Sequence, residues 1–211
     1  MHHFIPSLAV KSRRIWPVIP AGVVCLALSQ SASAATVFIN EFHYDNNGTD
    51  IDEGVEIAGL AGTSLNNWAL LFYNGNNGSV YRTQALSGVI ENESNGFGVL
   101  SFMISGLQNG PNDGIALIDN NSTVLEFLSY EGPLLATEGA ASGMTSVDVG
   151  VSEASTSASG FSIQRIGSGS ESDNFDWTID TASFGAINSN QQFASAVPVP
   201  AALPLFLTGL C

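Results

Sequence analysis

Acidic side chains are concentrated in one short segment near residue 50. Asp45, Asp50, Asp52 and Glu53 lie within nine residues, interspersed with asparagine, glycine and threonine. Ca²⁺ takes about six to eight oxygen ligands, and a flexible loop of carboxylates and carbonyls can supply them. These four residues therefore predict a metal site of the calcium-loop kind, although the position of the glycine and the strand that follows do not fit an EF-hand. The alternative is a solvated acidic turn.

Glu41 and Glu56 flank this segment in strand-like runs and could face each other across a sheet. Paired carboxylates carry out acid–base chemistry in glycosidases. We instead expect these two to make hydrogen bonds at the ends of their strands or to hold an ion. His43 is the only histidine after residue 3, so a nucleophilic triad would depend on it alone. We interpret it as an ordinary surface or strand histidine, and we assign no catalytic residue.

The charge of the chain excludes several functional classes. After residue 35 there is no lysine, and only Arg82 and Arg165 offset all 19 acidic residues, which leaves a net charge of −17. A Walker phosphate loop and a Schiff-base enzyme both need a lysine. Nucleic-acid binding relies on Lys and Arg to neutralise phosphates, so no nucleic-acid partner is expected. We expect Arg165, one of only two basic residues in this acidic domain, to pair with a carboxylate.

The first 35 residues have the three parts of a secretory signal peptide. A basic segment (11–14) precedes an apolar, uncharged segment (15–28), and small residues at 31–35 provide a cleavage site. The sequence therefore predicts a signal peptide over 1–35 and a secreted or cell-surface protein. No cysteine lies between Cys25 and Cys211, so the exported domain must be stable without an internal disulfide.

The middle of the chain has the pattern of an all-β domain. Runs rich in β-branched and aromatic residues alternate with turns rich in Gly, Asn and Asp, and no sustained helical period appears. The expected strands are 37–44, 54–57, 68–73, 79–83, 97–104, 114–118, 124–130, 162–166 and 177–179. This spacing favours a sandwich or barrel over 36–193, in which Trp68 fills the core and 132–160 forms a long loop.

The C-terminal segment, 194–211, combines a linker with an apolar tail. Residues 197–210 read Val-Pro-Val-Pro-Ala-Ala-Leu-Pro-Leu-Phe-Leu-Thr-Gly-Leu, which resembles the start of a PEP-CTERM sorting signal. The rest of that signal's transmembrane helix and its basic cluster are missing. The resemblance implies an exosortase-type sorting machinery as a partner, a location at the envelope of a Gram-negative bacterium, and no stable membrane span in the mature form.

The domain itself resembles the lamin-tail domain. Five motifs carry the resemblance: Ile-Asn-Glu-Phe at 39–42, Glu-Gly-Val-Glu-Ile at 53–57, Leu-Asn-Asn-Trp-Ala-Leu at 65–70, Ser-Ile-Gln-Arg at 162–165 and Thr-Ala-Ser-Phe-Gly-Ala-Ile-Asn at 181–188. The last motif lacks the family's proline and contains an insertion. The resemblance implies an immunoglobulin-like β-sandwich that is secreted and serves as an accessory binding or scaffolding module.

Together these features predict an exported, non-catalytic binding or structural module of the cell surface or extracellular matrix. The expected binding partner is an extracellular polysaccharide or a protein. The alternative is an accessory domain or small metal-dependent hydrolase related to secreted nucleases, in which the acidic cluster would hold a divalent ion.

Overall fold

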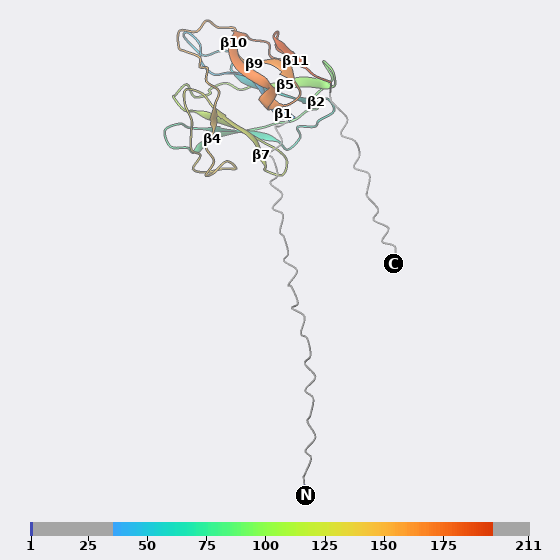
Figure 1. The fold of residues 1–211 in the computed structure, drawn as a ribbon. Helices are drawn as coiled ribbons and strands as arrows, with labels where there is room; N and C mark the ends of the chain where they lie inside the picture. The colour runs from blue at the N-terminus through green and yellow to red at the C-terminus, as the bar shows by residue number, and fades with distance from the viewer. Residues whose placement is uncertain (2–35, 196–211) are drawn as a thin grey trace. The chain divides into compact units, whose positions relative to one another are not determined.

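The computed structural model describes Met1 and residues 36–195; the predicted signal peptide, apart from Met1, and the tail beyond Ser195 lie outside the described residues. The described part is built from two β-sheets (Figure 1). The first sheet has the order β10 (Phe175–Thr181), β9 (Phe161–Gly169), β1 (Val37–His43), β2 (Gly54–Leu60) and β5 (Phe97–Met103), with β11 (Gln191–Phe193) parallel to β9. The second sheet has the order β4 (Val80–Ala85), β3 (Ala69–Tyr73), β6 (Gly114–Ile118), β7 (Val124–Ser129) and β8 (Val147–Asp148).

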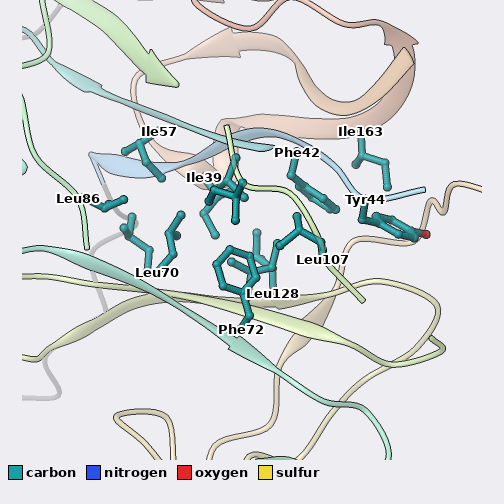
Figure 2. Packing of buried hydrophobic residues seen from close by; sticks show 14 of the residues in the cluster. Ile39, Phe42, Tyr44, Ile57, Leu70, Phe72, Leu86, Leu107, Leu128 and Ile163 are labelled. Carbon is teal, nitrogen blue, oxygen red and sulfur yellow. The ribbon is translucent and has the colours of Figure 1, made fainter. Parts of the chain in front are cut away.

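The main hydrophobic core lies between the two sheets. Alternate residues of each strand point to opposite faces, so one set from each sheet faces the other layer. Figure 2 shows this set of buried side chains, among them Ile39, Phe42, Ile57 and Ile163 from the first sheet and Leu70, Phe72 and Leu128 from the second. Leu86 and Leu107, in loops, add to the same cluster. The prediction of an all-β sandwich is confirmed.

The outer face of the second sheet is also covered. Leu71 and Tyr73 of β3 point away from the main core and pack against Leu134, Ala136 and Ala141 of the long loop that precedes β9. This second cluster explains why the segment 69–73 is continuously apolar, since both of its faces are buried. The long loop contains the two-residue strand β8 and no helical turn among its described residues.

The outer face of the first sheet carries a cluster of phenylalanines. Phe38, Phe97, Phe175 and Phe193 pack together there, with the rings of Phe97 and Phe193 stacked 4.8 Å apart. Phe193 belongs to β11, a strand that the sequence did not predict. The return of the chain through β11 therefore closes the domain over this face.

The predicted position of Trp68 in the core is corrected. Trp68 is only partly buried at the edge of the main core, because it precedes β3 instead of lying within it. The largest fully buried side chains are instead the tyrosines at positions 44, 73 and 130.

The described residues contain one short 3-10 helix, η1 (Ser172–Asn174), which precedes β10. None of the helices in the described residues is long and apolar enough to cross a membrane.

Candidate functional site

The two paired glutamates lie beneath the segment that joins β10 to β11. A bulge in β1 between Ile39 and Glu41 places Asn40 out of the regular ladder. Asn40 Nδ2 donates to Glu56 Oε1 (3.0 Å), and Asn40 Oδ1 accepts from Gln191 Nε2 (2.6 Å). Glu41 and Glu56 are directly paired across β1 and β2, and both are fully buried. The expectation that they face each other on adjacent strands is confirmed.

Hydrogen-bond donors from this segment and from the neighbouring strands occupy every oxygen of both carboxylates. Glu41 Oε1 accepts from Ser162 Oγ (2.7 Å) and from the backbone N–H of Ser183 (2.8 Å), and its Oε2 accepts from Ser183 Oγ (2.9 Å). Glu56 Oε2 accepts from Ser101 Oγ (2.6 Å) and from the backbone N–H of Gly185 (2.7 Å). The two glutamates therefore hold the 182–190 segment onto the sheet.

Burial changes the protonation of both groups. It raises the pKa of Glu41 above its ordinary value, and the hydrogen bonds from Ser162 and Ser183 oppose that rise only in part. Burial likewise raises the pKa of Glu56 to about 7, despite the hydrogen bonds from Ser101, Asn40 and Gly185. A raised carboxyl pKa in a cleft is typical of a general acid. Here, however, every oxygen already has a protein donor, so the arrangement fits a structural tie.

Arg165 joins the two sheets through an ion pair with a carboxylate on the opposite sheet. Its guanidinium extends from β9 and donates to Glu126 Oε1 on β7 (2.6 Å), to the Ile39 carbonyl (2.8 Å) and to the Ser172 carbonyl (2.7 Å). It also lies 4.4 Å from the ring of Trp177. Both members of this ion pair are nearly inaccessible to solvent. The prediction that Arg165 contacts a carboxylate is confirmed.

His43 is the last residue of β1, which agrees with its interpretation as a strand histidine, and its side chain is buried instead of lying on the surface. Its Nδ1 lies 2.7 Å from Glu153 Oε1, and its Nε2 lies 3.2 Å from Asn46 Oδ1 and 3.1 Å from the Ile51 carbonyl. Asn46 Nδ2 donates to two backbone carbonyls, which fixes its Oδ1 as the atom that faces the histidine. Both ring nitrogens therefore face acceptors, which is the environment of an imidazolium. Burial lowers the pKa of His43, but the hydrogen bond and charge of Glu153 raise it further, with a net increase.

Glu153 fastens the long loop to the end of β1. While Oε1 pairs with His43, Oε2 accepts from the backbone N–H groups of Tyr44 (2.8 Å) and Asp45 (3.1 Å). The Tyr44 hydroxyl in turn accepts from the Glu153 N–H (2.8 Å). The loop is thus anchored by contacts that span more than a hundred residues of sequence.

Glu153→Gln is expected to destabilise the fold by about 2–3 kcal/mol. The three partners of the carboxylate are all donors, and the glutamine amide can accept with only one of its two terminal atoms. Urea unfolding of the wild type and the variant measures the change. Glu138→Gln is the control: this glutamate lies in the same loop, is exposed, and accepts one backbone N–H from Val80 (2.8 Å). Equal losses in the two variants would contradict the assigned role of Glu153.

The four predicted calcium ligands do not converge on one point. Glu53 is buried, and its two oxygens accept the backbone N–H groups of Gly106 (2.6 Å) and Leu107 (2.8 Å). Asp52 is exposed, with a φ of 59°. Across Met1 and 36–195, no group of three or more His, Cys, Asp or Glu side chains is placed to hold a metal ion.

Two members of the predicted loop do interact. Burial raises the pKa of Asp45, and the charge of Asp50 adds to the increase. Asp50 also accepts from the backbone N–H of Asn46 (3.2 Å) and from Asn109 Nδ2 (2.9 Å). These contacts are those of an acidic turn closed by hydrogen bonds. The calcium loop stays a prediction, and thermal melts in EDTA and in millimolar Ca²⁺ at fixed ionic strength distinguish it from the solvated turn.

A cavity of about 350 Å³ lies beside this turn, at residues that the sequence interpretation treated only as connections. It is bounded by the β3–β4 turn and by the loop that leads from β5 to β6. Its lining residues are Asn74, Asn76, Gln108, Asn109, Gly110, Pro111 and Asp113. We call this cavity the amide pocket. The only sequence signal was the density of amide residues in two separate loops.

No protein-family model, curated protein or solved structure matches this chain. The lamin-tail and PEP-CTERM resemblances therefore stay predictions from the sequence motifs.

Proposed function

We propose that the protein is an exported, non-catalytic module of the cell surface or extracellular matrix that binds or scaffolds other molecules. The signal-peptide pattern at 1–35 and the sorting motif at 197–210 support the location. We further propose that the domain is of the lamin-tail type. In support, the family-like residues Asn40, Glu41, Glu56, Ser162 and Asn188 meet in one buried network.

The observation that carries the non-catalytic assignment is the saturation of Glu41 and Glu56 by internal donors. A general acid or base must reach the proton that it transfers, at about hydrogen-bond distance from the substrate. Both glutamates are fully buried, and their oxygens contact serine, asparagine and backbone donors of the same chain. His43 is similarly enclosed between Glu153 and the turn at Asn46. These contacts favour a role in stability for all three residues.

We expect the purified protein not to hydrolyse single- or double-stranded DNA, RNA or a small phosphodiester substrate in the presence of Ca²⁺, Mg²⁺ or Mn²⁺. The matched comparison is Asp52→Asn/Glu53→Gln, which removes two of the four predicted metal ligands. Turnover that Glu41→Gln or Glu56→Gln abolishes, in a variant that keeps the wild-type melting temperature, would contradict the proposal and favour the hydrolase.

A further inference from the structure

We propose that Asn47 is a modification site, at which the side-chain amide is converted to a carboxylate without an enzyme. Asparagine is chemically labile, and a glycine that follows it has no side chain to hinder ring closure. The chain contains five Asn–Gly pairs, which start at residues 47, 74, 77, 95 and 109. Because all five share the same dipeptide, their surroundings in the fold decide which of them reacts.

The reaction of an Asn–Gly pair requires a free glycine N–H. The glycine nitrogen gives up its proton to solvent and attacks Cγ of the asparagine. A new C–N bond closes a succinimide ring, and the side-chain nitrogen leaves as ammonia. Water then opens the ring at either carbonyl, which leaves aspartate or, with the backbone routed through the side chain, isoaspartate. A glycine N–H that donates to an acceptor must first lose that hydrogen bond.

Asp113 protects two of the pairs. Its Oδ1 accepts from the Gly75 N–H (2.7 Å), and its Oδ2 accepts from the Gly110 N–H (2.9 Å). Asp113 is almost inaccessible to solvent, so water competes little for these hydrogen bonds. The Asn109 side chain is also held, because its Nδ2 donates to Asp50 Oδ2 (2.9 Å). Reaction at either pair therefore requires these loops to open locally.

The pair 77–78 is held within the β3–β4 turn. The Gly78 N–H donates to the Asn74 carbonyl (2.8 Å). Asn77 Oδ1 accepts from the N–H (2.9 Å) and the hydroxyl (2.7 Å) of Ser79. Gly78 is also buried, although Asn77 is exposed. The attacking nitrogen and the side chain that it would attack are thus both held by other groups.

The pair 95–96 is fixed at two points. The Gly96 N–H donates to Asn92 Oδ1 (3.1 Å), and Asn95 Nδ2 donates to the Phe193 carbonyl of β11 (2.7 Å). Asn95 is nevertheless exposed to solvent. Exposure alone therefore does not distinguish the pairs, whereas the hydrogen bonds of the glycine N–H and of the asparagine side chain do.

The pair Asn47–Gly48 lacks both kinds of protection. Neither the Gly48 N–H nor the Asn47 side-chain amide makes a hydrogen bond to a described residue. Both residues are exposed, and no atom would lie within 4 Å of a Cβ placed at Gly48. The anchors of Asn47 leave the two reacting atoms free: its N–H donates to the Ser157 carbonyl (2.8 Å), and its carbonyl accepts from Asn46 Nδ2 (3.2 Å).

The modification changes the charge of the acidic turn. It adds a carboxylate at residue 47, between Asp45 and Asp50 in the sequence. Burial and the charge of Asp50 already raise the pKa of Asp45. The isoaspartate product also lengthens the backbone of the turn by one methylene. The turn therefore becomes more negative and changes its backbone with the age of the protein.

The test is incubation of the purified protein at pH 8, folded and in parallel unfolded in guanidinium chloride, with the products at each pair measured by peptide mapping and mass spectrometry. In the folded protein we expect Asn47 to react about tenfold faster or more than each of the other four asparagines, as the lack of one or two protecting hydrogen bonds implies. In the unfolded chain the five rates should converge. The product at residue 47 should be a mixture of aspartate and isoaspartate.

Asn47→Gln is the matched variant, because glutamine must close a larger ring and its backbone can keep both anchors of Asn47. We expect it to remove the acidic species that the wild type forms first on anion exchange, at an unchanged melting temperature. The proposal is overturned if Asn47 reacts no faster than the other four asparagines in the folded protein, or if it leads by the same factor in guanidinium chloride. Aspartate without isoaspartate, or the same acidic species formed at the wild-type rate in Asn47→Gln, would also overturn it.

Discussion

Arg165→Ala is expected to lower the free energy of unfolding by about 3–5 kcal/mol, which corresponds to a melting temperature about 10 °C lower. The substitution removes three hydrogen bonds and two cation–π contacts, to Phe38 and Trp177, at the junction of the two sheets. It also leaves Glu126 buried without its counter-ion, although the Ile39 N–H still donates to it (2.7 Å). A buried charge that has lost its partner is the main source of the cost.

The pH dependence of this loss identifies its cause. Burial raises the pKa of Glu126, and the charge of Arg165 lowers it. Without Arg165 the rise is larger, so the carboxyl takes up a proton more readily in the folded variant. We therefore expect Arg165→Ala to cost less at pH 5 than at pH 8, as measured by urea unfolding at both values.

Arg82→Ala is the matched control, because Arg82 is the only other basic residue apart from histidine after residue 35. Its guanidinium donates to the Ser105 carbonyl at an exposed position and forms no ion pair among the described residues. We expect a loss of less than about 1 kcal/mol. A similar loss for both arginines, or a cost of Arg165→Ala that does not change with pH, would contradict the assigned role of the ion pair.

The protein is expected to be most stable near pH 5 and to lose stability as the pH rises to about 8. The largest contributions come from Glu56 and Glu126, since burial raises the pKa of each from 4.5 to about 7. We take Glu56 as the example. Between these two values the folded state binds more protons than the unfolded state, so the free energy of unfolding falls as the pH rises. The size of this contribution is on the order of 3 kcal/mol.

His43 acts in the same direction. Its pKa is raised in the folded protein, so its contribution is fully present below the unfolded value of 6.5 and is lost as the pH rises through the folded value. Glu41 and Asp113, whose pKa values burial also raises, add to the trend. Urea unfolding at pH 5, 6, 7 and 8 at constant ionic strength measures the sum. Stability that increases from pH 5 to pH 8 would contradict the prediction.

Glu56→Gln isolates one of the two largest contributions. The glutamine cannot ionise, so the free energy of unfolding of this variant should change less steeply with pH than that of the wild type. Glu91→Gln is the control, since Glu91 is exposed and its side chain makes no hydrogen bond to a described residue. An unchanged slope in Glu56→Gln would assign the pH dependence to other groups.

The sequence by itself determined the class of fold and most of the strands. Alternation, aromatic and β-branched runs and turn residues report local burial, and these patterns located nine of the strands to within a few residues. The continuous apolar run before Asn74 matches a strand that is buried on both faces. The scarcity of basic residues pointed to an ion pair at Arg165, because a lone cation in an acidic, partly buried strand needs a counter-ion.

Only the tertiary structure decided what each polar residue contacts. Glu41 binds Ser183, 142 residues away, and His43 pairs with Glu153, 110 residues away. No periodic pattern encodes such pairs, since they depend on strand order and on how the long loop packs. The same reason explains why the hydrogen bonds from the Gly106 and Leu107 N–H groups to Glu53 could not be read from the sequence. It also explains why the amide pocket was not foreseen, because its two walls meet only when β3 and β6 pair.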